Sequence, residues 1–174
     1  RPFHRQYLMT QASRLFDFFE AASINPKGGF YELSDEGQPL APDNAVRQIH
    51  VTTRMIHCAA IGSLIGRPGS DEIIDHGMQY LWNKHRDRRH GGYVWSLNDS
   101  GHADGSKQAY GHAFVLLAGS SAKLVGHPLA DQVIADVTEV IEKRFWDKKV
   151  GAVREEFGND WSQISTYRGQ NSNM

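Results

Sequence analysis

The sequence of 174 residues lacks several features that mark particular classes of protein. Its single cysteine, Cys58, excludes an internal disulfide and is typical of a reducing compartment. Its longest apolar runs, such as residues 113–118, are far too short to span a bilayer, and residues 1–6 lack the apolar stretch of a secretory signal. With 19 Lys and Arg against 20 Asp and Glu, it also lacks the basic surplus of a nucleic-acid-binding domain. These absences predict a cytoplasmic protein without membrane or nucleic-acid partners.

Metal-site and nucleophile motifs are also missing, although nine histidines are present. No two histidines are four residues apart, no His-Glu-x-x-His occurs, and one cysteine cannot form a thiolate site. His50 and His57 can share a helix face, but no carboxylate accompanies them there. The chain has neither a glycine-rich phosphate loop nor a Gly-x-Ser-x-Gly motif. We therefore predict packed or solvated histidines and no metal.

What the chain does contain is an internal repeat of about sixty residues. A Gly-Gly-aromatic motif at 28–30 recurs at 91–93 and, more weakly, as Gly-Ala-Val at 151–153, each time followed by a polar turn. A helix-stop signal at 64–68, with glycine followed by proline two residues later, recurs at 124–128. Two independent markers with one period predict a repeat architecture.

Between these markers the apolar spacing predicts five helices. They span about residues 5–21, 43–65, 70–82, 107–125 and 129–146. The second and fourth carry small residues and few charges, whereas the third and fifth have an apolar stripe opposite a charged face. Asp43 and Ser70 are the expected N-caps of the second and third helices.

This alternation predicts an inner and an outer layer, because a helix that is apolar most of the way round is surrounded by protein. Repeated αα-hairpins of this kind form a solenoid or a closed α/α barrel. A ring of six hairpins needs more than twice this length, and residue 174 falls in the opening turns of a third inner helix. We therefore expect residues 1–174 to be the N-terminal part of a single barrel domain. Its open ends predict association with another copy.

Polar residues of the inner helices are the candidate ligand groups, because these helices line the cleft of such a barrel. Arg54 stands in an apolar stretch and is either paired within the fold or available to a polar ligand. His50 precedes it by one turn on the same face. Tyr110 opens the second inner helix after Lys107 and Gln108, which either bind hydroxyls or satisfy backbone groups.

The start of the third unit, residues 167–173, is rich in amides. Because asparagine disfavours helix interiors, Asn171 is either a helix cap or a ligand group. Four tryptophans supply aromatic surface on which sugars stack, although most tryptophans belong to a core. Those residues are Trp82, Trp95, Trp146 and Trp161.

Five motifs, at 28–30, 53–55, 66–68, 107–114 and 168–174, together resemble the N-acylglucosamine 2-epimerase superfamily. The closing Arg-Gly-Gln-Asn-Ser-Asn-Met resembles the bacterial aldose–ketose isomerases of that superfamily, the mannose and sulfoquinovose isomerases. The resemblance covers essentially the whole chain. It implies an all-α (α/α)6 barrel, in agreement with the repeat found independently.

The resemblance implies an enzyme that interconverts an aldose and its ketose, foremost D-mannose and D-fructose, through a cis-enediol and without a metal or organic cofactor. It places Arg54, Tyr110 and Asn171 where family members contact sugar hydroxyls and the developing enediolate. His50 falls at a variable position that touches the substrate. The proton-transferring histidines are expected after Met174, so the given sequence alone is not expected to catalyse.

Three other functions remain open. A 2-epimerase of N-acylglucosamine or of a disaccharide is disfavoured by the Asn-Ser-Asn-Met ending. A sulfoquinovose isomerase needs cations for the sulfonate, and the sequence near Arg54 has no such cluster. The third is a non-catalytic α/α-repeat module that binds carbohydrate, which predicts sugar affinity without turnover.

Overall fold

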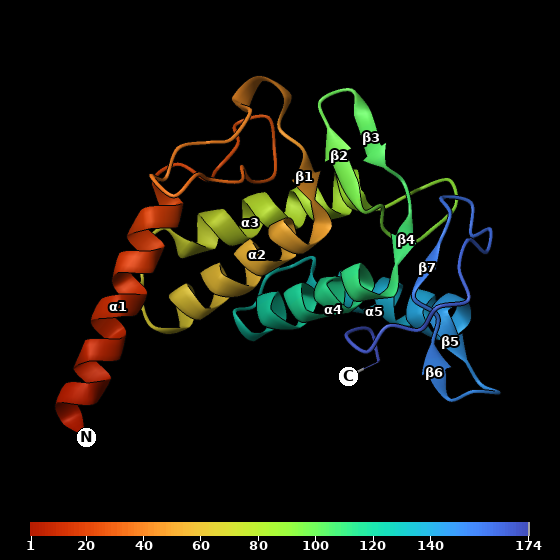
Figure 1. Ribbon diagram of the computed structural model, residues 1–174. Coiled ribbons are helices and arrows are strands. Elements are labelled where there is room, and N and C mark those ends of the chain that lie inside the picture. The colour runs from red at the N-terminus through yellow and green to blue at the C-terminus, as the bar shows by residue number, and fades with distance from the viewer. Residues whose placement is uncertain (174) are drawn as a thin grey trace.

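The computed structural model describes residues 1–173, which form helices and short strands in a repeated order (Figure 1). The α-helices are α1 (Pro2–Glu20), α2 (Ile49–Leu64), α3 (Ser70–Tyr80), α4 (Ala109–Leu124) and α5 (Ala130–Val140). The strands are β1 (Arg47–Gln48), β2 (Ser96–Asn98), β3 (Gly101–Asp104), β4 (Lys107–Gln108), β5 (Trp146–Asp147), β6 (Ala152–Val153) and β7 (Glu156–Phe157). The bounds of α4 and α5 follow those of α2 and α3 by sixty residues, so the predicted period is confirmed.

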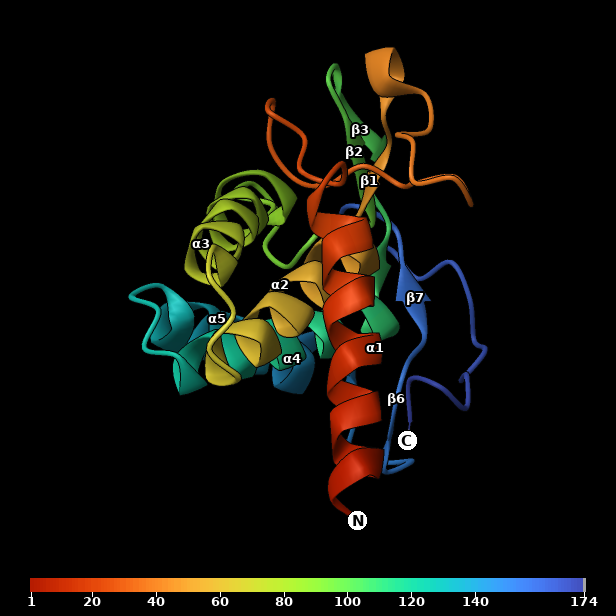
Figure 2. The same ribbon diagram turned by 90° about the vertical axis from the view of Figure 1, so that its left-hand side faces the viewer.

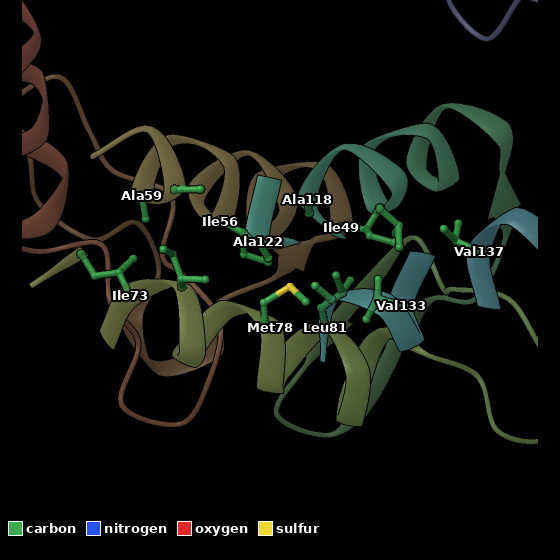
Figure 3. Packing of buried hydrophobic residues seen from close by; sticks show 14 of the residues in the cluster. Ile49, Ile56, Ala59, Ile73, Met78, Leu81, Ala118, Ala122, Val133 and Val137 are labelled. Atoms are coloured by element: carbon green, nitrogen blue, oxygen red, sulfur yellow. The ribbon is translucent and has the colours of Figure 1, made fainter. Parts of the chain in front are cut away.

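The helices form two layers. α2 and α4 lie side by side, α3 packs on α2, and α5 packs on α4 (Figures 1 and 2). Figure 3 shows Ile73 and Met78 of α3 pointing toward Ile56 and Ala59 of α2, all of them buried. The predicted inner and outer helices therefore bury their apolar faces against each other, and this burial is the main stabilising term of the unit.

Glycine allows the outer helix to approach the inner one closely. A Cβ atom placed on Gly77 of α3 would lie 2.5 Å from Cγ1 of Ile56, nearer than packed carbon atoms come. The small residues that the sequence places in these helices therefore set the spacing between the layers.

Short antiparallel strand pairs hold the starts of the inner helices. Arg47 of β1 pairs with Leu97 of β2, and sixty residues later Lys107 of β4 pairs with Phe157 of β7. The backbone N–H of Ile49 then donates to Trp95 O. Each inner helix is thus tied to the hairpin that precedes the next unit.

Three helix starts differ from the prediction. Asp43 is no N-cap, because it lies in a short 3-10 helix at Pro42–Asn44, and α2 begins at Ile49 after β1. In the same way residues 107–108 form β4 rather than the first turn of α4. The N-cap of α3 is Gly69, and Ser70 is already helical. Pairing with a distant strand outweighs the local helix preference at the first two sites.

The expected third inner helix is not formed within the described residues. The segment 167–173 contains only a turn at residues 170–172. Its polar groups are bound instead to the preceding hairpin: Gly169 N–H donates to Glu155 Oε2 (2.8 Å), and Val153 N–H donates to Asn173 Oδ1 (2.7 Å). These bonds hold the segment against the hairpin, and nucleating a helical turn is costly.

The outer helices share an irregularity at their ends. The segments Leu81–His85 and Ile141–Phe145 are π-turns, in which a backbone N–H bonds to the carbonyl five residues earlier. Both His85 and Phe145 are fully buried. A π-turn adds one residue to the helix, so both outer helices carry the same insertion at the same position.

The opening helix α1 extends from one side of the two layers, as Figure 2 shows. It matches the predicted helix but contains no buried residue. Among the described residues, no helix combines the length and the apolar character that crossing a membrane requires.

The close contact at Gly77 gives a first prediction. We expect Gly77→Ala to lower the free energy of unfolding by about 1–3 kcal/mol, although alanine favours helix, because the added methyl group displaces Ile56. Urea denaturation measures the change. The control Gln79→Ala, at an exposed position of α3, should leave stability unchanged or slightly raised, and an equal loss in both variants would contradict this explanation.

Two buried histidines give a second prediction. Burial lowers the pKa of both His85 and His112 from the ordinary 6.5 to about 4. Between these pH values the unfolded chain binds more protons, so stability falls as the pH drops from 6.5 toward 4, by about 3 kcal/mol for each histidine. Urea denaturation at several pH values measures this slope, which should be shallower in His112→Gln. An unchanged slope would refute the assignment.

Candidate functional site

Arg54 and Tyr110 meet between the two inner helices. Arg54 Nη2, from α2, donates to the hydroxyl oxygen of Tyr110, from α4, at 2.8 Å. The guanidinium carbon lies 4.7 Å from the ring centre of Phe114, which also packs edge-on against Tyr110. Among residues 1–173 no carboxylate forms an ion pair with Arg54. The arginine is therefore oriented by neutral groups and keeps its positive charge.

This geometry leaves hydrogen-bond donors free. The Tyr110 hydroxyl accepts from Arg54, so its own hydrogen can be donated to another oxygen. A guanidinium has five N–H donors, and the bond to Tyr110 uses one. Both groups are thus able to bind the hydroxyl or carbonyl oxygens of a polar ligand.

His50 lies one turn before Arg54 on α2. Its ring stacks on Trp95, with the ring centres 5.1 Å apart, and its buried Nδ1 atom has no partner among the described residues. Burial and then the charge of Arg54 lower the pKa of His50, while Glu32 acts in the opposite direction. The imidazole is therefore neutral at physiological pH, able to donate through one nitrogen and accept through the other.

Asn171, the fourth predicted site residue, is not hydrogen-bonded to these three. It is exposed in the turn at residues 170–172, and no hydrogen bond joins its side chain to another described residue. The structure therefore brings His50, Arg54 and Tyr110 onto neighbouring inner helices, whereas Asn171 forms no hydrogen bond with them.

An apolar groove of about 550 Å³ also borders Arg54. It runs between α1 and α2 and is lined mainly by carbon, including Leu15, Phe16, Phe19 and Met55. Such a lining offers few partners for sugar hydroxyls, so the polar site is the face of Arg54 toward Tyr110. Neither this groove nor the stacking of Arg54 on Phe114 is evident from the sequence.

The polar residues before α4 do not have the roles that the sequence predicts for them. Lys107 neither binds hydroxyls nor caps the backbone: it is fully buried and donates to Asp87 Oδ2 at 2.7 Å. Gln108 is half-buried and bonds only weakly, at 3.4 Å, to Ser106 Oγ. The pair formed by Lys107 and Asp87 was missed because its members are twenty residues apart and lie in different elements.

The other candidates have structural contacts. His57 Nδ1 lies 2.8 Å from Ser121 Oγ of α4, and Trp82 and Trp95 pack against the main core. Within residues 1–173, no three His, Cys, Asp or Glu side chains are placed to hold a metal ion. Independence from a metal stays a prediction.

Comparisons with known proteins identify the family of the chain. Residues 28–174 match the family model described as N-acylglucosamine 2-epimerase (GlcNAc 2-epimerase). D-mannose isomerases of Pseudomonas cannabina pv. alisalensis and Thermobifida fusca are 43% and 42% identical over 174 and 175 residues. The matches cover 99% and 100% of this chain but 41% and 42% of those proteins.

Solved structures likewise match nearly all of this chain and less than half of their own length. A D-mannose isomerase crystal structure superposes with a TM-score of 0.89 at 33% identity, over 96% of this chain and 44% of that one. Cellobiose 2-epimerase from Spirochaeta thermophila superposes with a TM-score of 0.81 at 26% identity, over 94% of this chain and 42% of that one. The predicted fold is confirmed: the described residues form part of an (α/α)6 barrel, spanning about two fifths of these relatives.

The environment of His50 gives a third prediction. We expect NMR titration to give a pKa for His50 below the ordinary 6.5. The variant Arg54→Met should raise that pKa because it removes the cation, yet not restore it fully, because burial is the larger cause. The control Arg88→Met, at an exposed position outside the site, should leave the titration of His50 unchanged. A lower pKa in Arg54→Met would refute the assignment.

Proposed function

Because the chain belongs to the N-acylglucosamine 2-epimerase family, we propose that the protein carrying it is a sugar isomerase that interconverts D-mannose and D-fructose. The identity to D-mannose isomerases supports the reaction, and the Arg54–Tyr110 pair is the observation that carries the site. Since the chain spans 41–42% of those relatives, the activity is proposed for the whole protein. Residues 1–174 are then part of one catalytic barrel domain.

The proposed reaction moves a proton between C2 and C1 of the open-chain sugar. Loss of the C2 proton moves its electron pair onto the carbonyl oxygen and gives a cis-enediolate. The hydrogen of the C2 hydroxyl then moves to the C1 oxygen, and protonation at C1, as the C2 oxygen forms the new carbonyl, yields the ketose. Arg54 and Tyr110 stabilise the negative oxygen, because fixed donors aimed at developing charge lower the barrier. The family resemblance assigns the proton transfers to histidines outside this sequence, and the chemistry needs only acid–base groups.

The remaining candidate groups bind the substrate in this proposal. His50, neutral and partly buried, contacts a hydroxyl near Arg54 and influences the choice of sugar. Asn171 reaches the sugar from the third unit. A neutral monosaccharide is favoured over a sulfonated one because Arg54 is the only cation among the three residues that the structure brings together.

A 2-epimerase is the second candidate, and the superposition with a cellobiose 2-epimerase favours it. Both reactions begin with loss of the C2 proton, so the same oxygen-binding groups serve both. The products separate them: an isomerase converts D-mannose into D-fructose, whereas an epimerase returns the proton to C2 and forms D-glucose.

The site gives a fourth prediction, measured on the natural full-length protein with D-mannose as substrate. We expect Tyr110→Phe to lower kcat/KM about 100-fold or more, because one donor to the enediolate oxygen is lost, and Arg54→Ala to lower it further. D-fructose formation is followed by chromatography. The matched control Tyr7→Phe, at an exposed tyrosine of α1, should retain the wild-type rate. Unchanged rates in both site variants would refute the site.

A further inference from the structure

A cation precedes three of the four candidate ligand residues by three positions. The cations are Arg47, Lys107 and Arg168, and the residues three positions later are His50, Tyr110 and Asn171. The three occurrences belong to three successive units of the repeat. A relation that recurs in all three units calls for a physical reason.

Each of these cations is bound to a carboxylate. Arg47 Nη2 lies 2.6 Å from Asp99 Oδ1, and its side chain is 4% exposed. Lys107 Nζ lies 2.7 Å from Asp87 Oδ2, with both side chains buried. The third pair joins Arg168 Nη2 to Asp147 Oδ2 at 2.7 Å, with both side chains largely buried. The Lys107–Asp87 pair is shielded from water, whereas Asp99 and Arg168 stay partly exposed. An ion pair with a buried member has a defined geometry, and leaving that member unpaired is costly.

The first unit obtains its carboxylate from a different place. In the second and third units the carboxylate also closes the glycine turn: Asp87 Oδ1 accepts from Arg89 N–H, and Asp147 accepts in the same way. In the first unit the equivalent acceptor is the neutral amide of Asn25, which receives Lys27 N–H. Arg47 is neutralised instead by Asp99, from the turn between β2 and β3. The repeat thus keeps the ion pair even where the turn residue carries no charge.

The first turns of the inner helices depend on such anchors. Neither α2 nor α4 has a side-chain N-cap, although the first four N–H groups of a helix lack partners within it. One backbone bond ties each start to a hairpin, from Ile49 N–H to Trp95 O and from Ala109 N–H to Glu155 O. The ion pair adds a fixed point to this bond and to the strand pairing, and it acts where the strand passes into the helix.

We propose that these cation–carboxylate pairs position the substrate-binding residues that follow them, so that Lys107 with Asp87 sets Tyr110 and Arg47 with Asp99 sets His50. Lys107 and Asp87 are then positioning residues, which act through Tyr110 without touching the sugar. This inference rests on the proposed sugar-binding role of Tyr110.

The test is a double-mutant cycle in the natural full-length protein, with D-mannose turnover as the readout. Lys107→Met should lower kcat/KM about 10-fold to 100-fold when Tyr110 is intact, because a displaced donor contributes little to the transition state. In the Y110F background the same substitution should change kcat/KM by less than about twofold, because the group that it positions is already absent.

Two further variants separate the effect of the charge from effects on the turn and on the fold. Asp87→Asn keeps a turn acceptor of the kind that Asn25 provides but removes the charge, so it should lower kcat/KM as Lys107→Met does. The matched control is Arg86→Gln, which breaks the part-buried Arg86–Asp136 pair (2.6 Å) without preceding a candidate ligand residue by three positions. Its effect should simply multiply with that of Y110F.

Amide hydrogen exchange at residues 109–112 provides a readout that needs no turnover. Exchange should rise in Lys107→Met and Asp87→Asn and stay at the wild-type rate in Arg86→Gln. Multiplicative effects of Lys107→Met and Y110F would overturn the inference even if D-mannose is isomerised. Failure of the wild-type protein to isomerise D-mannose would overturn the proposed function. The exchange rates alone would then decide whether the pair orders the start of α4, and unchanged rates would reject it.

Discussion

The packing of α2 directly against α4 is the constraint on which the candidate site depends. Gly111 of α4 has no side chain to separate the helices, and a Cβ atom there would lie 3.0 Å from Cγ2 of Ile49. The two helices start at the same end, as Figure 1 shows, so Arg54 of one reaches Tyr110 in the first turn of the other. One repeat unit supplies the guanidinium and the next supplies the hydroxyl. A single unit therefore cannot form the site, and the repeat is a requirement of the chemistry as well as of the fold.

The distribution of charge sets Arg54 apart from the cations whose side chains are shielded from water. Five cations with shielded side chains each meet a carboxylate: Arg47, Arg67, Arg86, Lys107 and Arg168. Arg54 is oriented by Tyr110 and Phe114 instead, neither of which neutralises it. Shielded cations must be paired because desolvation is costly, whereas an exposed one can keep its charge and remain ordered. The fold thus holds the Arg54 guanidinium in a fixed direction and leaves its charge available.

The period, the two helix types and the glycine turns could be predicted because they are local or repeat within the chain. Arg54 and Tyr110 could be chosen for the same reason, since each is a polar residue in an otherwise apolar inner helix. The helix starts could not, because Arg47 and Lys107 are held by strands about fifty residues away. Asp43 has a side chain suited to an N-cap, but the pairing of Arg47 with Leu97 places a strand before the helix, which therefore begins at Ile49. The turn at residues 170–172 was missed because its segment is bound to a hairpin through Glu155.

The π-turns at the ends of the outer helices change the direction in which the residues at the helix ends point. One extra residue turns everything after it by about 100° around the helix axis. This rotation directs His85 to Val94, whose carbonyl accepts from its Nδ1, and it places Phe145 against Phe157. Without the added residue, each side chain would face another direction and its hairpin would lose that contact. The two insertions therefore fix the direction in which the chain leaves the outer layer to reach the next inner helix.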